Sequence, residues 1–133
     1  MRMVLDASVA VAAARPNEPS HGPARSRIVQ VLGGHDDIAV PAIFPIEVAA
    51  SLARVGEPIA SINAYVDALM SVATVSAIGP RRARRIREIA MVTKLRGADA
   101  IYVWLANHEY APLCTLDREM AQRGSAVCQI ISP

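Results

Sequence analysis

Short apolar runs alternate along the chain with longer segments in which apolar residues recur at helical spacing. The apolar runs predict strands over residues 3–5, 38–40, 72–78, 113–115 and 127–131. The longer segments predict helices over residues 8–14, 24–32, 45–55, 59–71, 81–95, 98–109 and 117–123. Strands that alternate with helices, without hairpin signals, are typical of an α/β domain with a mainly parallel sheet.

Several segments make more specific predictions. Residues 15–23 hold three prolines and a glycine, which indicates a loop. Residues 98–109 are apolar around nearly the whole helix, so this helix is expected to be buried. Two further helices are expected to turn one apolar stripe toward the core: Phe44, Val48, Leu52 and Val55 in one, and Ile86, Ile89, Ala90 and Val92 in the other.

The size and composition of the chain limit its class. A length of 133 residues corresponds to a single domain over residues 1–133. No apolar stretch is long enough to cross a membrane, and the N-terminus lacks the apolar stretch of a signal peptide. Cys114 and Cys128 are expected to be small buried side chains in a reducing compartment, and the three histidines to lie on the surface. These features predict a cytoplasmic protein without a membrane partner.

Four acidic residues follow predicted strands or open predicted helices. Asp6 comes directly after the first strand, and Asp117 follows the strand over residues 113–115. Glu47 and Asp99 lie in the first turns of predicted helices. Ligands of open α/β sheets collect beyond the carboxyl ends of the strands, so these four side chains are expected near one rim.

Each acid also has a structural explanation, because Asp and Glu are favoured at helix starts. Asp99, however, adjoins the apolar run over residues 101–105, where an unpaired charge is costly unless a cation or hydrogen bonds compensate it. Like charges that meet in one pocket need a cation between them, and oxygen ligands favour Mg²⁺ or Mn²⁺ over zinc. The hydroxyls of Ser8 and Thr115 are placed to orient a carboxylate or a bound water, although turn or strand chemistry explains them equally well.

A metal held by carboxylates suggests hydrolysis of a phosphodiester. Such an ion keeps several waters, and one of them can be lowered in pKa and oriented as the nucleophile. The candidate catalytic and metal-binding residues are therefore Asp6, Glu47, Asp99 and Asp117.

In this order and spacing, four short segments resemble the PIN-domain family, and within it the VapC-type toxins of toxin–antitoxin pairs. They are Val4-Leu5-Asp6-Ala7-Ser8, Pro45-Ile46-Glu47-Val48, Gly97-Ala98-Asp99-Ala100-Ile101-Tyr102 and Thr115-Leu116-Asp117. The resemblance implies a three-layer fold with a parallel sheet flanked by helices. It also implies Mg²⁺- or Mn²⁺-dependent cleavage of RNA that leaves a 5′-phosphate, a homodimer, and a cognate antitoxin protein as partner. Glu119 is a possible accessory ligand in such a site.

The basic residues are unusual in kind, because thirteen of the fourteen are arginine. Five of the seven residues from Arg81 to Arg87 are arginine, which suits phosphate or antitoxin contact but also fits a solvated helix face. Arg96, just before the third acidic segment, is placed to reach a substrate phosphate. Two other functions compete with the nuclease: a non-catalytic PIN-fold module that binds RNA or protein, and a phosphate-accepting receiver domain. A receiver domain has adjacent acidic residues after its first strand and a lysine late in the chain. Here Asp6 stands alone after its strand and Lys94 is the single lysine, which argues against the receiver domain.

Overall fold

Five parallel strands form one sheet in the computed structural model, which describes residues 1–133. The strands are β1 (Arg2–Leu5), β2 (Asp37–Pro41), β3 (Ala73–Ser76), β4 (Leu113–Cys114) and β5 (Ile130–Ile131). Their order across the sheet is β3-β2-β1-β4-β5, and every neighbouring pair is parallel. The predicted α/β class with a parallel sheet is confirmed.

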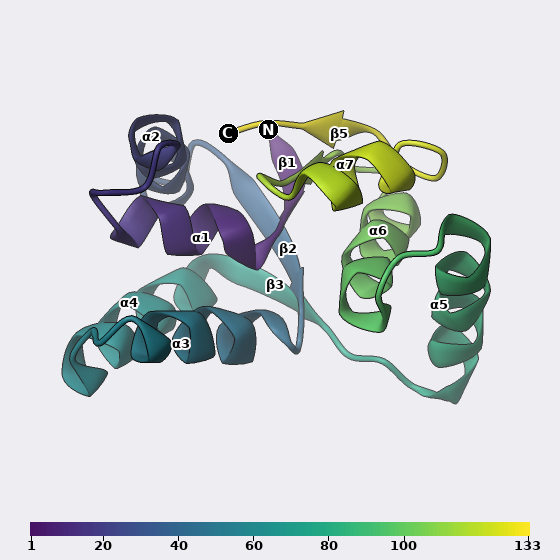
Figure 1. The fold of residues 1–133 in the computed structure, drawn as a ribbon, viewed down its shortest axis with the longest axis horizontal. Coiled ribbons are helices and arrows are strands. Elements are labelled where there is room, and N and C mark those ends of the chain that lie inside the picture. Colours follow the sequence, from purple (N-terminus) through teal and green to yellow (C-terminus); the bar gives the residue numbers. More distant parts are fainter.

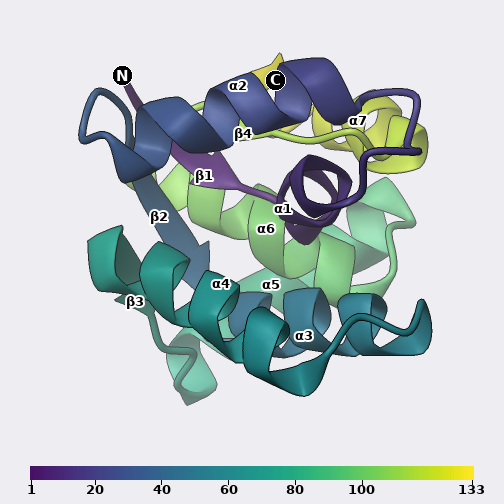
Figure 2. The ribbon, with the colours of Figure 1, turned by 90° about the vertical axis from the view of Figure 1, so that its left-hand side faces the viewer.

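Seven helices cover the two faces of the sheet and complete a three-layer architecture (Figure 1). One layer holds α1 (Ala7–Ala14), α2 (His21–Leu32), α3 (Phe44–Arg54) and α4 (Ile59–Val72). Figure 2 views this layer from the outside, with the sheet and α6 behind it. The opposite layer holds α5 (Pro80–Thr93), α6 (Gly97–Glu109) and α7 (Arg118–Gly124). None of the seven combines the length and the apolar character that crossing a bilayer requires.

The core lies on both faces of β1 and around α6. Met3, Val4 and Leu5 are completely buried, as expected for a central parallel strand covered by helices on both sides. Helix α6 is buried from Tyr102 to Ala106, in agreement with its continuous apolar sequence. Cys114 is buried in β4 as a free thiol, as predicted.

The order of the strands creates a topological switch point between β1 and β4. The chain runs outward from β1 through β2 to β3, and then returns to the other side of β1 to form β4 and β5. Leu5 at the end of β1 is paired with Cys114 at the end of β4. The residues that follow these two strands are therefore neighbours, and ligands of such sheets bind at this place.

Some sequence-based expectations are wrong. Helix α2 begins at His21, inside the predicted loop, because a proline is tolerated in the first turn of a helix. His21 is half-buried rather than on the surface, and its Nδ1 lies 3.0 Å from the carbonyl oxygen of Ala12. The last strand is only two residues long, because the backbone of Cys128 still bonds to Gly124 after α7.

Two residues of the predicted apolar stripes face solvent. Val55 lies just beyond the end of α3 and is 45% exposed. Val92 is 79% exposed, because the buried side of α5 is formed by Ile86, Ile89 and Thr93 and position 92 is rotated away from it.

Candidate functional site

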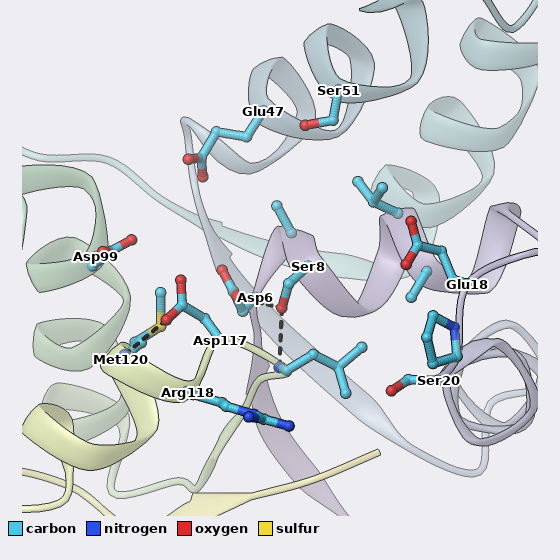
Figure 3. A pocket seen from close by; sticks show the side chains of 15 residues that line it. Asp6, Ser8, Glu18, Ser20, Glu47, Ser51, Asp99, Asp117, Arg118 and Met120 are labelled. Carbon is cyan, nitrogen blue, oxygen red and sulfur yellow. Dashed lines mark hydrogen bonds between the residues drawn. The ribbon is translucent and has the colours of Figure 1, made fainter. Parts of the chain in front are cut away.

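The four acidic side chains singled out in the sequence line one pocket of about 570 Å³ (Figure 3). Asp6 follows β1, Asp117 precedes α7, and Glu47 and Asp99 lie in the first turns of α3 and α6. The pocket thus receives side chains from both helical layers at the switch point between β1 and β4. Polar residues that also line it are Ser8, Glu18, Ser20, Ser51 and Arg118.

Asp6 is the most deeply buried of the four acids, with 5% of its surface exposed. Its Oδ2 accepts hydrogen bonds from the hydroxyls of Ser8, at 2.5 Å, and Thr115, at 2.9 Å. The side chain makes no capping bond to α1, so helix capping does not explain this acid. Burial raises its pKa, the hydrogen bonds from Ser8 and Thr115 oppose this effect, and the charge of Asp117 adds to it.

The same two hydroxyls also fix the backbone after β4. Ser8 Oγ accepts a hydrogen bond from the backbone N–H of Leu116 at 3.0 Å, and Thr115 Oγ1 accepts one from that of Asp117 at 3.0 Å. Each hydroxyl therefore links the Asp6 carboxylate to the segment that carries Asp117. Asp117 itself does act as a helix cap, because its Oδ1 accepts a hydrogen bond from the N–H of Met120 at 2.9 Å.

Glu47 is held from the opposite layer by Tyr102. The Tyr102 hydroxyl donates a hydrogen bond of 2.5 Å to Glu47 Oε1, and Tyr102 as a whole is 1% exposed. Burial raises the pKa of Glu47, Tyr102 opposes the increase, and the charge of Asp6 contributes to it. From the sequence, Tyr102 is predicted only as part of the buried helix over residues 98–109. The available signal was its position three residues after Asp99 on one helix, together with the need of a buried tyrosine for a polar partner.

Asp99 shows most clearly that the four carboxylates interact. Burial raises its pKa to about 6, with further contributions from the charges of Asp117, Asp6 and Glu47. The positive charge of Arg96 acts in the opposite direction. A half-buried carboxylate with three others in the same pocket is costly to ionise, and the repulsion is relieved when a cation binds.

The donor set suits a hard divalent ion, because the four acids offer only oxygen. As the side chains stand, no three Asp, Glu, His or Cys side chains converge closely enough to coordinate one ion. Coordination by three or more of these carboxylates therefore requires their side chains to move toward one another. Ser51, one turn after Glu47 on α3, adds a hydroxyl to the same wall and was not identified from the sequence.

Two other residues considered from the sequence lie outside the pocket lining. Arg96 occupies the N-cap position of α6 with an exposed side chain, and it influences Asp99 through its charge. Glu119 forms an ion pair with Arg123, with 3.4 Å between Oε1 and Nε. Its carboxylate is therefore paired with a residue of the same helix, α7, and does not line the pocket.

The PIN domain family model matches residues 3–125 of the chain. The protein therefore belongs to the PIN-domain family, as the four acidic segments suggested. None of the curated proteins compared with the sequence matches it.

Several solved structures share the fold. PAE2754 from Pyrobaculum aerophilum aligns with a TM-score of 0.74 and 21% identity, over 99% of this chain and 89% of the other. VapC20 from Mycobacterium tuberculosis, described as a sarcin-ricin loop cleaving toxin, aligns with a TM-score of 0.73 and 16% identity over 92% and 95%. VapBC2 from Rickettsia felis, described as bound to a promoter DNA fragment, aligns with a TM-score of 0.69 and 14% identity over 100% and 99%.

Proposed function

We propose that residues 1–133 form a single PIN nuclease domain that hydrolyses RNA phosphodiester bonds with Mg²⁺ or Mn²⁺. The observation that carries the proposal is the meeting of Asp6, Glu47, Asp99 and Asp117, from four different segments, in one pocket at the switch point. Four carboxylates gathered in this way repel one another, and the Asp6 side chain makes no capping bond that would account for it. A divalent cation supplies the missing charge.

The residues of the chain have separate parts in this proposal. Asp6, Glu47, Asp99 and Asp117 would hold the metal, and Ser8 and Thr115 keep the Asp6 carboxylate oriented. A bound ion of this kind lowers the pKa of a water and stabilises the charge that develops on the phosphate. Arg118, which lines the pocket, is placed to bind a substrate phosphate, and Arg96 extends the positive charge outside it.

The proposal extends to the biological setting. We propose a toxin that acts on RNA in the cytoplasm, works as a homodimer and is inhibited by an antitoxin protein. The description of VapC20, which shares the fold, as a toxin supports the first part of this proposal. Apolar side chains left on the surface, such as Ile46, Ile59 and Val92, provide area for protein contacts. Sedimentation of the purified chain tests the dimer, and a monomer mass at micromolar concentration contradicts it.

Cleavage of a mixed RNA pool by the purified protein, with Mg²⁺ or Mn²⁺ and with EDTA, tests the nuclease. We expect cleavage that requires the metal and falls at least 100-fold in Asp6→Asn and Asp117→Asn, on the order expected when an essential metal ligand is lost. The control is Asp67→Asn, since Asp67 is exposed on α4, forms no ion pair and lies outside the pocket.

Two results contradict the proposal. Cleavage that survives Asp6→Asn and Asp117→Asn, in variants with an unchanged circular dichroism spectrum, excludes this pocket as the catalytic site. A folded, metal-loaded protein that binds RNA without cutting it supports the non-catalytic binding module instead.

A further inference from the structure

The first half of α5 presents a group of arginines to solvent that the pocket does not use. Arg81, Arg84, Arg85 and Arg87 are all exposed, and we refer to these four residues as the basic face of α5. Arg85 forms an ion pair with Glu88 at 3.2 Å, and the other three form none. Arg82 is turned inward, where its guanidinium lies 5.4 Å from the centre of the Trp104 ring.

Apart from the ion pair between Arg85 and Glu88, the basic face does not stabilise its own helix. Arg81 lies in the first turn, where the partial positive charge of the helix N-terminus repels a cation. The spacing is four residues between Arg81 and Arg85 and three residues between Arg84 and Arg87. Like charges at either spacing destabilise a helix. An anion from outside the chain would relieve both unfavourable terms.

The charges of the molecule are strongly segregated. Five of the twelve acidic residues but only one of the fourteen basic residues, Arg118, line the pocket, which leaves seven acidic and thirteen basic residues outside it. Five arginines form ion pairs, so nine basic residues have no carboxylate partner. Six of these nine lie between positions 81 and 96: Arg81, Arg82, Arg84, Arg87, Lys94 and Arg96.

This basic segment leads to the rim of the pocket. Helix α5 lies beside α6 (Figure 1), and the turn that contains Lys94 and Arg96 connects it to the helix start that carries Asp99. Arg118 continues the positive charge into the pocket lining. A pocket with four carboxylates repels the phosphates of RNA, so affinity for RNA has to come from cations beside it.

We propose that the basic face of α5 binds the phosphate backbone of RNA whose scissile bond lies at the acidic pocket. This inference rests on the proposed function, because it assigns a second contact region to the same substrate. The planar guanidinium forks of arginine suit phosphate oxygens. The four residues of the basic face are all arginine, and the exposed apolar residues of the helix, Met91 and Val92, lie in its second half.

Binding of a fluorescently labelled single-stranded RNA, followed by anisotropy in EDTA at several salt concentrations, tests the assignment without cleavage. The test variant is Arg84→Gln/Arg87→Gln. The matched control is Arg25→Gln/Arg54→Gln, which removes the same charge from two exposed, unpaired arginines on α2 and α3. We expect the slope of log affinity against log salt to fall by about 1.4 in the test variant, at about 0.7 per lost phosphate contact.

At about 0.1 M salt, we expect an affinity loss on the order of tenfold in the test variant and less than about twofold in the control. In cleavage assays with metal, the test variant should raise KM and leave kcat unchanged, because the basic face lies outside the pocket. Equal losses in both double variants would mean that only net charge matters, and unchanged RNA affinity would mean that the face serves a protein. Either result overturns the RNA contact of the basic face and leaves the proposed nuclease function standing. A wild-type protein that neither binds nor cuts RNA overturns both proposals.

Discussion

At the level of single residues, the pocket is organised by hydroxyl groups that each satisfy two partners. Ser8 and Thr115 donate to Asp6 and at the same time accept from the backbone next to Asp117. Tyr102 donates to Glu47 from the other helical layer. Asp6 and Glu47 are thus held in place by hydroxyl donors, and Asp117 by the hydrogen bond from the backbone N–H of Met120 in α7. No arginine or lysine is bonded to any of these three carboxylates.

Replacing Tyr102 by Phe removes the hydroxyl that positions Glu47 and leaves the ring in the core. A hydrogen bond to a charged acceptor contributes about 1.5–3 kcal/mol, so we expect a modest loss of stability. We also expect metal affinity and cleavage rate to fall on the order of tenfold, because Glu47 loses its fixed orientation. Titration with Mn²⁺ and single-turnover cleavage measure the two effects.

The matched control is Tyr65→Phe. The Tyr65 hydroxyl donates a hydrogen bond of 2.7 Å to the carbonyl oxygen of Ala10, away from the four carboxylates. This variant should lose about 1 kcal/mol of stability while its metal affinity stays unchanged. If both variants reduce metal affinity equally, Tyr102 has no positioning role.

At the level of elements, the position of α7 determines where Asp117 lies, and this helix is packed tightly on α6. A Cβ atom added to Gly124 at the end of α7 would lie 2.8 Å from Val103 Cγ2. Real Cβ atoms do not approach a neighbour so closely, so a side chain here forces α7 or α6 to move. The glycine is needed for close packing between the two helices.

We therefore expect Gly124→Ala to lower the free energy of unfolding by about 1–3 kcal/mol, as overpacking of a well-filled site does. Urea unfolding measures the change. Gly22→Ala is the control, because nothing lies within 4 Å of a Cβ at Gly22 in α2, and alanine there should stabilise by up to about 1 kcal/mol. The double variant Gly124→Ala/Val103→Ala should be less unstable than the sum of its two single changes. Full additivity would show that α6 and α7 do not clash.

The elements also show where sequence reasoning succeeds. Hydrophobic periodicity located all seven helices and the five strands, because burial against the sheet imposes that period. The strand order was not predictable, since it depends on pairings such as Leu5 with Cys114 that lie far apart in the chain. The same holds for Tyr102 and Glu47, which are 55 residues apart and meet only across the two layers. Val92 was predicted on the apolar stripe but faces solvent, because the next residue, Thr93, takes the buried position on α5.

At the level of the whole molecule, negative charge is concentrated in the pocket and positive charge on the surface around α5 to α7. The separation has a cost in the metal-free protein, since the four carboxylates repel one another in a partly desolvated place. Stability at neutral pH should therefore depend on whether a cation is bound, in addition to the quality of the core.

Asp99→Asn tests this dependence through stability, independently of cleavage. The pKa of Asp99 is about 6 in the folded protein and near 3.8 without the fold, so the folded state holds its proton more tightly. Stability that is present below about pH 4 is then lost as the pH rises toward about 6. In EDTA at about pH 7 we expect Asp99→Asn to be more stable than the wild type, on the order of 1 kcal/mol after discounting for solvent screening, and to show no gain at about pH 4.

Adding Mg²⁺ should reverse the order of stability of the two proteins, because only the wild type keeps the full set of carboxylates. Thermal unfolding across this pH range measures both effects, and an Asn variant that is less stable than the wild type in EDTA at neutral pH would show that neither burial nor the neighbouring carboxylates destabilise ionised Asp99.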